Sequence, residues 1–118
     1  EPGDALLVRT GWFKRWRERK ATEAQWAGLH PSCAQWIDEQ GFVLVAADNI
    51  AVEQGPSGDP KEAAPLHVEL IRNRGVHLAE LFDLEALTAT KRKSFLLMIS
   101  PLPIQGGVGS PINPVAVL

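Results

Sequence analysis

The chain has almost no cysteine, no long apolar run and no excess of basic charge. Its single Cys33 cannot form an intrachain disulfide, which favours a reducing compartment such as the cytoplasm over a secreted disulfide scaffold. Without about 18 consecutive apolar residues or a charged-then-apolar leader, the sequence predicts neither a membrane span nor a signal peptide. A formal net charge of -2 gives no general attraction for nucleic acid or an anionic membrane.

The amino-acid composition is that of an ordinary globular domain. The 118 residues are 45% hydrophobic and 22% charged, which is enough apolar material for one core. No internal repeat or second domain is visible, so residues 1–118 are expected to belong to one domain. The chain begins with Glu1 rather than Met, and we expect further sequence upstream.

The hydrophobic pattern predicts helices that alternate with strands. Residues 42–47 (FVLVAA) are nearly all apolar, as in a central strand that is covered on both faces. The segment after them is rich in Gly and Pro and is expected to form a loop. Further strands are expected at 4–10, 76–81 and 94–100, with 115–118 closing the sheet, and helices at 31–40, 62–74 and 83–89. This order predicts an α/β fold with a mostly buried sheet.

Two residues in this pattern are candidate metal ligands. His67 lies near the start of the helix expected at 62–74, and Glu80 lies on the strand expected to follow it. Glu80 stands among Leu78, Ala79 and Leu81, where burying a carboxylate is costly unless it meets a cation or hydrogen-bond donors. Catalytic zinc usually takes three protein ligands, so the remaining ligands are expected outside this chain.

Other polar and glycine-rich positions have both structural and functional interpretations. Asp48 ends the central strand, where its carboxylate could cap the following loop or contact a ligand beyond the carboxyl end of the sheet. The GGVGSP segment lacks the lysine of a phosphate-binding loop, which favours a tight turn. His30 is expected at a helix start, His77 in a structural contact, and Cys33 as a small apolar filler.

The segment WFKRWRERK interleaves aromatic and basic residues, a pattern that also occurs in modules that bind single-stranded nucleic acid. The acidic remainder of the chain argues against this interpretation, and a short helix or covering loop with a solvated basic face is the commoner cause.

Four segments in this order resemble the cyclase family of metal-dependent hydrolases, which includes kynurenine formamidases and isatin hydrolases. They are GDALLVRTGW, GLHPSCAQWIDEQGFVLVAADNIAVE, LHVELIRNRGVHLAELFDLEAL and the GGVGSP turn. The resemblance implies a swivelling β/β/α-type domain of which residues 1–118 are the C-terminal part. The family's H-x-G-T-H-x-D-x-P-x-H segment, which carries most of its metal ligands and its acid or base, has no counterpart here.

By this resemblance, His67 and Glu80 look like metal ligands for Zn²⁺ or Mn²⁺, and the catalytic residues are expected in the missing half. Trp12, Phe13 and Asp48 are expected near the substrate. The family's reactions imply hydrolysis of a carbon-nitrogen bond in a small amide, formamide or cyclic amide by metal-activated water, as in an arylformamidase of tryptophan catabolism. Such proteins are commonly homo-oligomers.

The alternative is a truncated or clipped scaffold without catalysis. Such a fragment would expose an unpaired sheet edge and apolar surface, which predicts association with a chain that carries the N-terminal half.

Overall fold

The computed structural model describes residues 1–58 and 61–118 of the chain. It separates into two compact units, Glu1–Leu84 and Glu85–Leu118. The first unit holds β1 (Ala5–Val8), α1 (Trp12–Arg17), α2 (Cys33–Glu39), β2 (Leu44–Ala47), α3 (Pro65–His67), η1 (Val68–Asn73) and β3 (His77–Ala79); the second holds α4 (Glu85–Ala89), β4 (Leu96–Met98) and β5 (Val115–Val117). None of the helices in the described part of the chain has the length and apolar character needed to span a bilayer.

The first unit is built on a parallel sheet of three strands in the order β1-β2-β3. Ala5 pairs with Leu44 at one side of β2, and Leu44 pairs with His77 at the other. The last three residues of β2 are fully buried, because parallel strands are covered on both faces. The central position predicted for the FVLVAA segment is confirmed, although the strand itself starts at Leu44.

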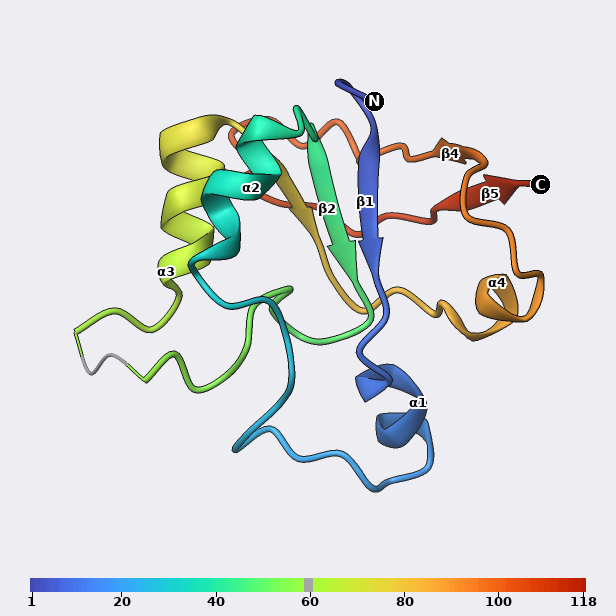
Figure 1. Ribbon diagram of the computed structural model, residues 1–118, viewed down its shortest axis with the longest axis horizontal. Coiled ribbons are helices and arrows are strands. Elements are labelled where there is room, and N and C mark those ends of the chain that lie inside the picture. Colours follow the sequence, from blue (N-terminus) through green and yellow to red (C-terminus); the bar gives the residue numbers. More distant parts are fainter. Residues whose placement is uncertain (59–60) are drawn as a thin grey trace. The chain divides into compact units, whose positions relative to one another are not determined.

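Helices α2 and α3, the latter continuing as η1, lie beside this sheet and cover one face of it (Figure 1). Ile37 of α2 and Leu70 of η1 are completely buried against Val45 of β2. Burying side chains of this size contributes about 1.5–3 kcal/mol each to the free energy of unfolding. Gly41 follows α2 with a φ of 72°, a conformation that glycine adopts at helix ends without steric cost.

The helix predicted over 62–74 differs from the prediction in two ways. It begins only at Pro65, where the fixed φ of proline suits the first helical position, and it widens into a π-helix from Val68 to Asn73. Such π-helical segments are uncommon and occur often at functional sites. Sequence periodicity near 3.6 cannot distinguish this geometry from an ordinary α-helix.

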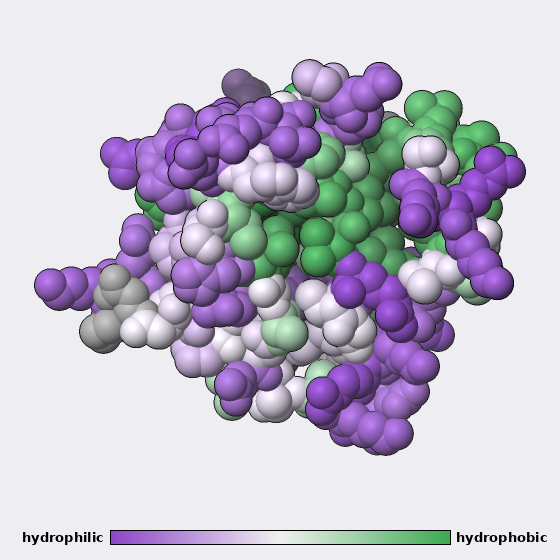
Figure 2. All heavy atoms as spheres, in the orientation of Figure 1, coloured by the Kyte–Doolittle hydropathy of each residue, from purple (hydrophilic) through white to green (hydrophobic). Residues whose placement is uncertain are grey.

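The aromatic and basic segment after β1 forms the short helix α1. Trp12 is buried at 6% exposure, whereas Trp16 is half exposed and stacks on it at 6.3 Å between ring centroids. Figure 2 shows hydrophilic surface over the region of α1 and over that of α2. This agrees with a solvated basic face on a helix that anchors one tryptophan in the core.

The second unit corrects two predictions. Strands β4 and β5 pair antiparallel with each other, Leu97 opposite Ala116, and form a sheet of their own instead of closing the parallel one. The strand expected at 94–100 is not buried, since Leu96 and Met98 are exposed at 62% and 54%. A short apolar run indicates a strand, but the choice of pairing partner depends on contacts distant in the sequence.

Candidate functional site

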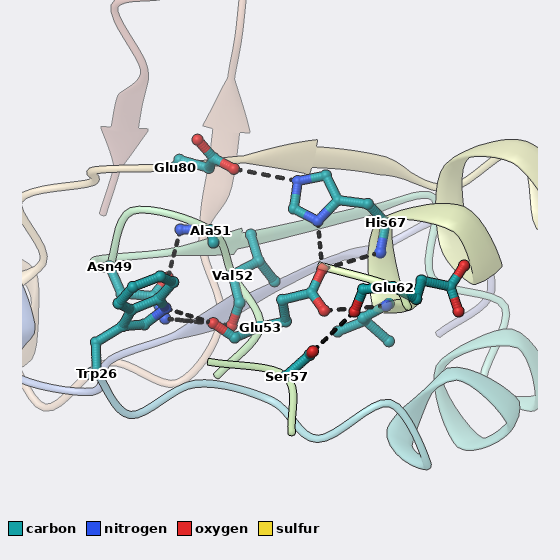
Figure 3. A network of polar contacts seen from close by, with 10 residues as sticks. Trp26, Asn49, Ala51, Val52, Glu53, Ser57, Glu62, His67 and Glu80 are labelled. Carbon is teal, nitrogen blue, oxygen red and sulfur yellow. Dashed lines mark hydrogen bonds and ion pairs between the residues drawn. The ribbon is translucent and has the colours of Figure 1, made fainter. Parts of the chain in front are cut away.

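The structure brings His67 and Glu80 together. His67 is the last residue of α3, and Glu80 follows directly after the end of β3 instead of lying on the strand as predicted. Nε2 of His67 lies 3.3 Å from Oε1 of Glu80. Figure 3 shows the imidazole ring with this carboxylate at one edge and a second carboxylate at the other.

The second carboxylate belongs to Glu53, which sequence reasoning did not single out. Its side chain is buried at 2% exposure, and Oε1 lies 2.5 Å from Nδ1 of His67. Oε1 also accepts the backbone N–H of His67, and Oε2 accepts that of Leu66, each at 3.1 Å. An ionised carboxylate only accepts hydrogen bonds, so Nδ1 carries the hydrogen in this contact.

Glu53 is placed by a rigid stretch of loop. The indole Nε1 of Trp26 donates to the carbonyl oxygen of Glu53 at 2.8 Å, and the buried amide of Asn49 donates to the same oxygen at 3.3 Å. Val52, just before it, has a φ of 59°, which is rare for a β-branched residue and costs about 1–3 kcal/mol. The loop therefore holds a strained conformation at the residue that directs Glu53 toward His67.

The two carboxylates raise the pKa of His67 above its ordinary value of 6.5. The hydrogen bond to Glu80 contributes most, partial burial opposes the rise, and the hydrogen bond and negative charge of Glu53 add to it. Without a metal, an imidazolium ion can donate from both ring nitrogens at once. A cation at Nε2 would replace the hydrogen that faces Glu80.

The chemistry of these side chains fits a divalent metal in part. A neutral imidazole nitrogen and a carboxylate oxygen are suitable donors for Zn²⁺ or Mn²⁺, and both groups are partly open to solvent. A carboxylate on the other ring nitrogen is the usual companion of a metal-binding histidine. Residues 1–58 and 61–118 contain no cluster of three or more donors placed to hold a metal. The pair offers two donors, fewer than the three protein ligands that a catalytic zinc usually takes.

Asp48 lies at the carboxyl end of β2, and both oxygens of its carboxylate accept hydrogen bonds. Oδ1 accepts the backbone N–H and the hydroxyl of Thr10 at 2.6 and 2.7 Å, and Oδ2 accepts the N–H of Gly11 at 2.7 Å. The side chain is buried at 1% exposure. Its carboxylate clamps the turn between β1 and α1 instead of capping the loop that follows it, and its contact with substrate stays a prediction.

The aromatic candidates occupy different positions. Trp12 lines a surface hollow together with Thr22, Trp26 and Gly55, beside the loop that carries Glu53. Phe13 packs on Trp16 at 5.6 Å between ring centroids and is not among the residues that line this hollow. The hollow is lined neither by His67 nor by Glu80, and the donor chemistry of that pair is the stronger guide to the site.

The remaining histidines have other roles. Nδ1 of His30 accepts the backbone N–H of Ser32 at 3.2 Å just before α2, which confirms its place at a helix start. His77 is exposed on β3, and its structural contact stays a prediction. In the basic segment, Arg17 pairs with Asp83 at 2.7 Å and Lys20 with Glu18 at 2.9 Å, so part of its charge is neutralised locally.

Comparison with known proteins identifies relatives of the chain as a whole. The Cyclase family model matches residues 1–54. A crystal structure of a novel cyclase superposes on 99% of the chain with a TM-score of 0.83 and 37% sequence identity. The chain is similar to cyclase-family proteins. Its mixed helix-and-strand fold is that of cyclase-family proteins.

Two further proteins to which this chain is similar are isatin hydrolases. The isatin hydrolase of Roseibium aggregatum is 30% identical over 122 residues, covering 98% of this chain and 45% of that protein. A crystal structure of an isatin hydrolase bound to the product analogue thioisatinate matches all of the chain with a TM-score of 0.75 and 26% identity, covering 47% of its own length. This chain covers 40% of the length of the novel cyclase. The chain thus spans less than half the length of each relative.

Proposed function

We propose that this chain forms part of a metal-dependent hydrolase that cleaves a carbon-nitrogen bond in a small amide, formamide or cyclic amide. The observation that supports the proposal is the approach of Nε2 of His67 to Oε1 of Glu80, two atoms of types that can bind a metal, from residues thirteen positions apart in sequence. Similarity to isatin hydrolases supports the reaction class, since opening a cyclic amide is hydrolysis of a carbon-nitrogen bond.

The residues of this chain would bind the metal and orient the substrate. His67 and Glu80 would hold a divalent cation, Zn²⁺ or Mn²⁺, which supplies Lewis-acid polarisation of a carbonyl and activation of water near neutral pH. Trp12 is 6% exposed, so an aromatic substrate ring would meet only the small exposed part of its indole that lines the hollow beside the loop of Glu53. The remaining metal ligands and the acid or base would come from sequence that this chain does not contain.

The test is metal analysis of the complete natural protein and of its His67→Ala and Glu80→Ala variants. Both variants should lose bound metal and hydrolysis of isatin or N-formylkynurenine, because each removes one of few donors. His77→Ala is a matched control, since His77 is an exposed histidine on β3 that makes neither contact of the pair, and it should be dispensable for metal content.

Unchanged metal content in both His67→Ala and Glu80→Ala would overturn the site. A complete protein that binds Zn²⁺ or Mn²⁺ but hydrolyses neither substrate class would overturn the reaction. A polypeptide of 12.9 kDa that is complete in the cell and binds no metal would favour the alternative of a non-catalytic scaffold.

A further inference from the structure

The buried carboxylate of Glu53 serves the imidazole of His67 in a way that a purely structural residue would not. It accepts three hydrogen bonds from two adjacent residues, namely the backbone N–H groups of Leu66 and His67 and the ring Nδ1–H of His67. The backbone contacts fix the position of the residue, and the ring contact fixes the rotation of its side chain. Together they determine where Nε2 points.

We propose that Glu53 is a positioning residue that sets the tautomer and orientation of His67, so that Nε2 presents its lone pair toward Glu80 and a shared divalent cation. The inference rests on the proposed metal-binding role of His67. An isolated neutral histidine can carry its hydrogen on either ring nitrogen, and only the form with Nδ1–H leaves Nε2 free to bind. A carboxylate faces each ring nitrogen, but Glu53 lies 2.5 Å from Nδ1 whereas Glu80 lies 3.3 Å from Nε2. The closer acceptor, Glu53, therefore favours the form with Nδ1–H.

The position of Glu53 involves two energetically unfavourable features, a buried carboxylate and a strained backbone. Burying a carboxylate at 2% exposure is unfavourable unless several donors surround it. The loop also keeps Val52 at a φ of 59° and ties the carbonyl of Glu53 to Trp26. A Cβ at Gly28 would overlap the backbone of Glu53, so only glycine permits this close approach. Strain and burial of this kind concentrate where a side chain must be held accurately.

Asp48 provides a matched control in the same unit. It is a second buried carboxylate, at 1% exposure, and it also accepts three hydrogen bonds, here from Thr10 and Gly11. None of its donors belongs to His67. Converting either carboxylate to an amide therefore disturbs three hydrogen bonds to a buried side chain. Only the change at Glu53 affects the imidazole of His67.

The experiment compares Glu53→Gln with Asp48→Asn in the complete natural protein by two readouts. The first is affinity for Zn²⁺ and Mn²⁺ by isothermal titration calorimetry, where Glu53→Gln should weaken binding about 10- to 100-fold, as loss of a carboxylate behind a metal-binding histidine does. The second is the ¹⁵N NMR signature of the His67 ring in metal-free protein above its pKa, where Glu53→Gln should shift hydrogen from Nδ1 to Nε2. Asp48→Asn should lower the melting temperature but leave both readouts as in wild type.

The outcomes separate this inference from the proposed function. Wild-type affinity and an Nδ1-protonated ring in folded Glu53→Gln, together with metal loss in His67→Ala, would overturn the role of Glu53 alone. If His67→Ala retains its metal, the metal-site proposal fails, and the ring signature of the metal-free protein still decides whether Glu53 sets the tautomer.

If Glu53→Gln does not fold, the more conservative variant Glu53→Asp tests the same role. Glu53→Asp keeps the charge but shortens the side chain, so the carboxylate cannot reach the ring and both backbone N–H groups. It should show metal affinity between wild type and His67→Ala. Wild-type affinity and an unchanged ring signature in Glu53→Asp would contradict the positioning role.

Discussion

Val52 and Leu81 share one left-handed backbone conformation, each with a φ of 59°, and each adjoins a carboxylate that contacts His67. Val52 precedes Glu53, and Leu81 follows Glu80. Residues other than glycine, asparagine and aspartate rarely adopt this region, because Cβ approaches the neighbouring backbone. The strain thus lies directly beside the two acidic side chains of the candidate site.

Leu81 allows the strain to be measured. Its side chain is 48% exposed, so little apolar burial is lost when it is replaced. Leu81→Asn should raise the free energy of unfolding by about 0.5–1 kcal/mol, because asparagine tolerates a positive φ. Urea denaturation of the complete protein measures the change. The control is Ile71→Asn, at a similarly exposed position within η1 without positive φ, which should be neutral or destabilising. Equal effects of the two substitutions would contradict the strain argument.

The stability of the metal-free protein should depend on pH through His67. The folded-state pKa of His67 lies above its ordinary value of 6.5, so its imidazolium form stabilises the fold. This contribution is fully present below about pH 6.5 and is lost as pH rises through the raised pKa. The difference in melting temperature between wild type and His67→Gln, measured with a chelator present, should therefore shrink with rising pH.

Added Zn²⁺ should reverse this trend, because the metal competes with the proton for Nε2 and binds better as pH rises. The opposite result, with a chelator present, is a difference in melting temperature between wild type and His67→Gln that grows as pH rises above 6.5. That result would show that the predicted sign of the His67 contribution is wrong.

The Asp48 clamp should matter for stability. In Asp48→Ala, the partly buried N–H groups of Thr10 and Gly11 lose their acceptor, and each unsatisfied group costs up to about 1–3 kcal/mol. We expect a loss of about 3 kcal/mol in the free energy of unfolding, measured with urea. Glu39→Ala is the surface control, since this residue is exposed at the end of α2. A loss below about 0.5 kcal/mol in Asp48→Ala, as is usual for surface changes, would contradict the clamp.

The loop that carries Glu53 should be intolerant of a methyl group at Gly55. A Cβ there would overlap the indole of Trp26, whose Nε1 holds the carbonyl of Glu53. Gly55→Ala should destabilise the protein by about 2 kcal/mol or more and change the fluorescence of Trp26, because the ring must move. Gly109→Ala, where a Cβ meets nothing within 4 Å, is the matched control. Wild-type fluorescence and stability in Gly55→Ala would refute the close approach.

The local elements were largely predictable from the sequence. The apolar FVLVAA segment indicated β2 and its central place, and Gly41 marked the end of α2. The donor types of His67 and Glu80 suggested a metal pair, and the structure does bring them within 3.3 Å. Their role as ligands stays a prediction. These features depend on composition and short-range periodicity, which act within a few residues of the chain.

Glu53 could not be found in this way. It stands after Val52 in an irregular loop rich in glycine and proline, and its only local sign is a carboxylate at the end of the AVE segment. Its partner His67 lies fourteen residues away, on a helix whose π-helical continuation was equally invisible. The carbonyl of Glu53 is held by Trp26, which comes from 27 residues away in the chain, and by Asn49, four residues before it.

The sequence by itself determined which segments become strands and helices and which side chains can donate to a metal, because side-chain chemistry and periodicity are local properties. Only the tertiary structure decided that β4 pairs with β5 apart from the parallel sheet, that Asp48 is clamped by Thr10 and Gly11, and that Glu53 is buried against His67. These outcomes depend on packing and hydrogen bonding between residues distant in sequence, which no local pattern encodes.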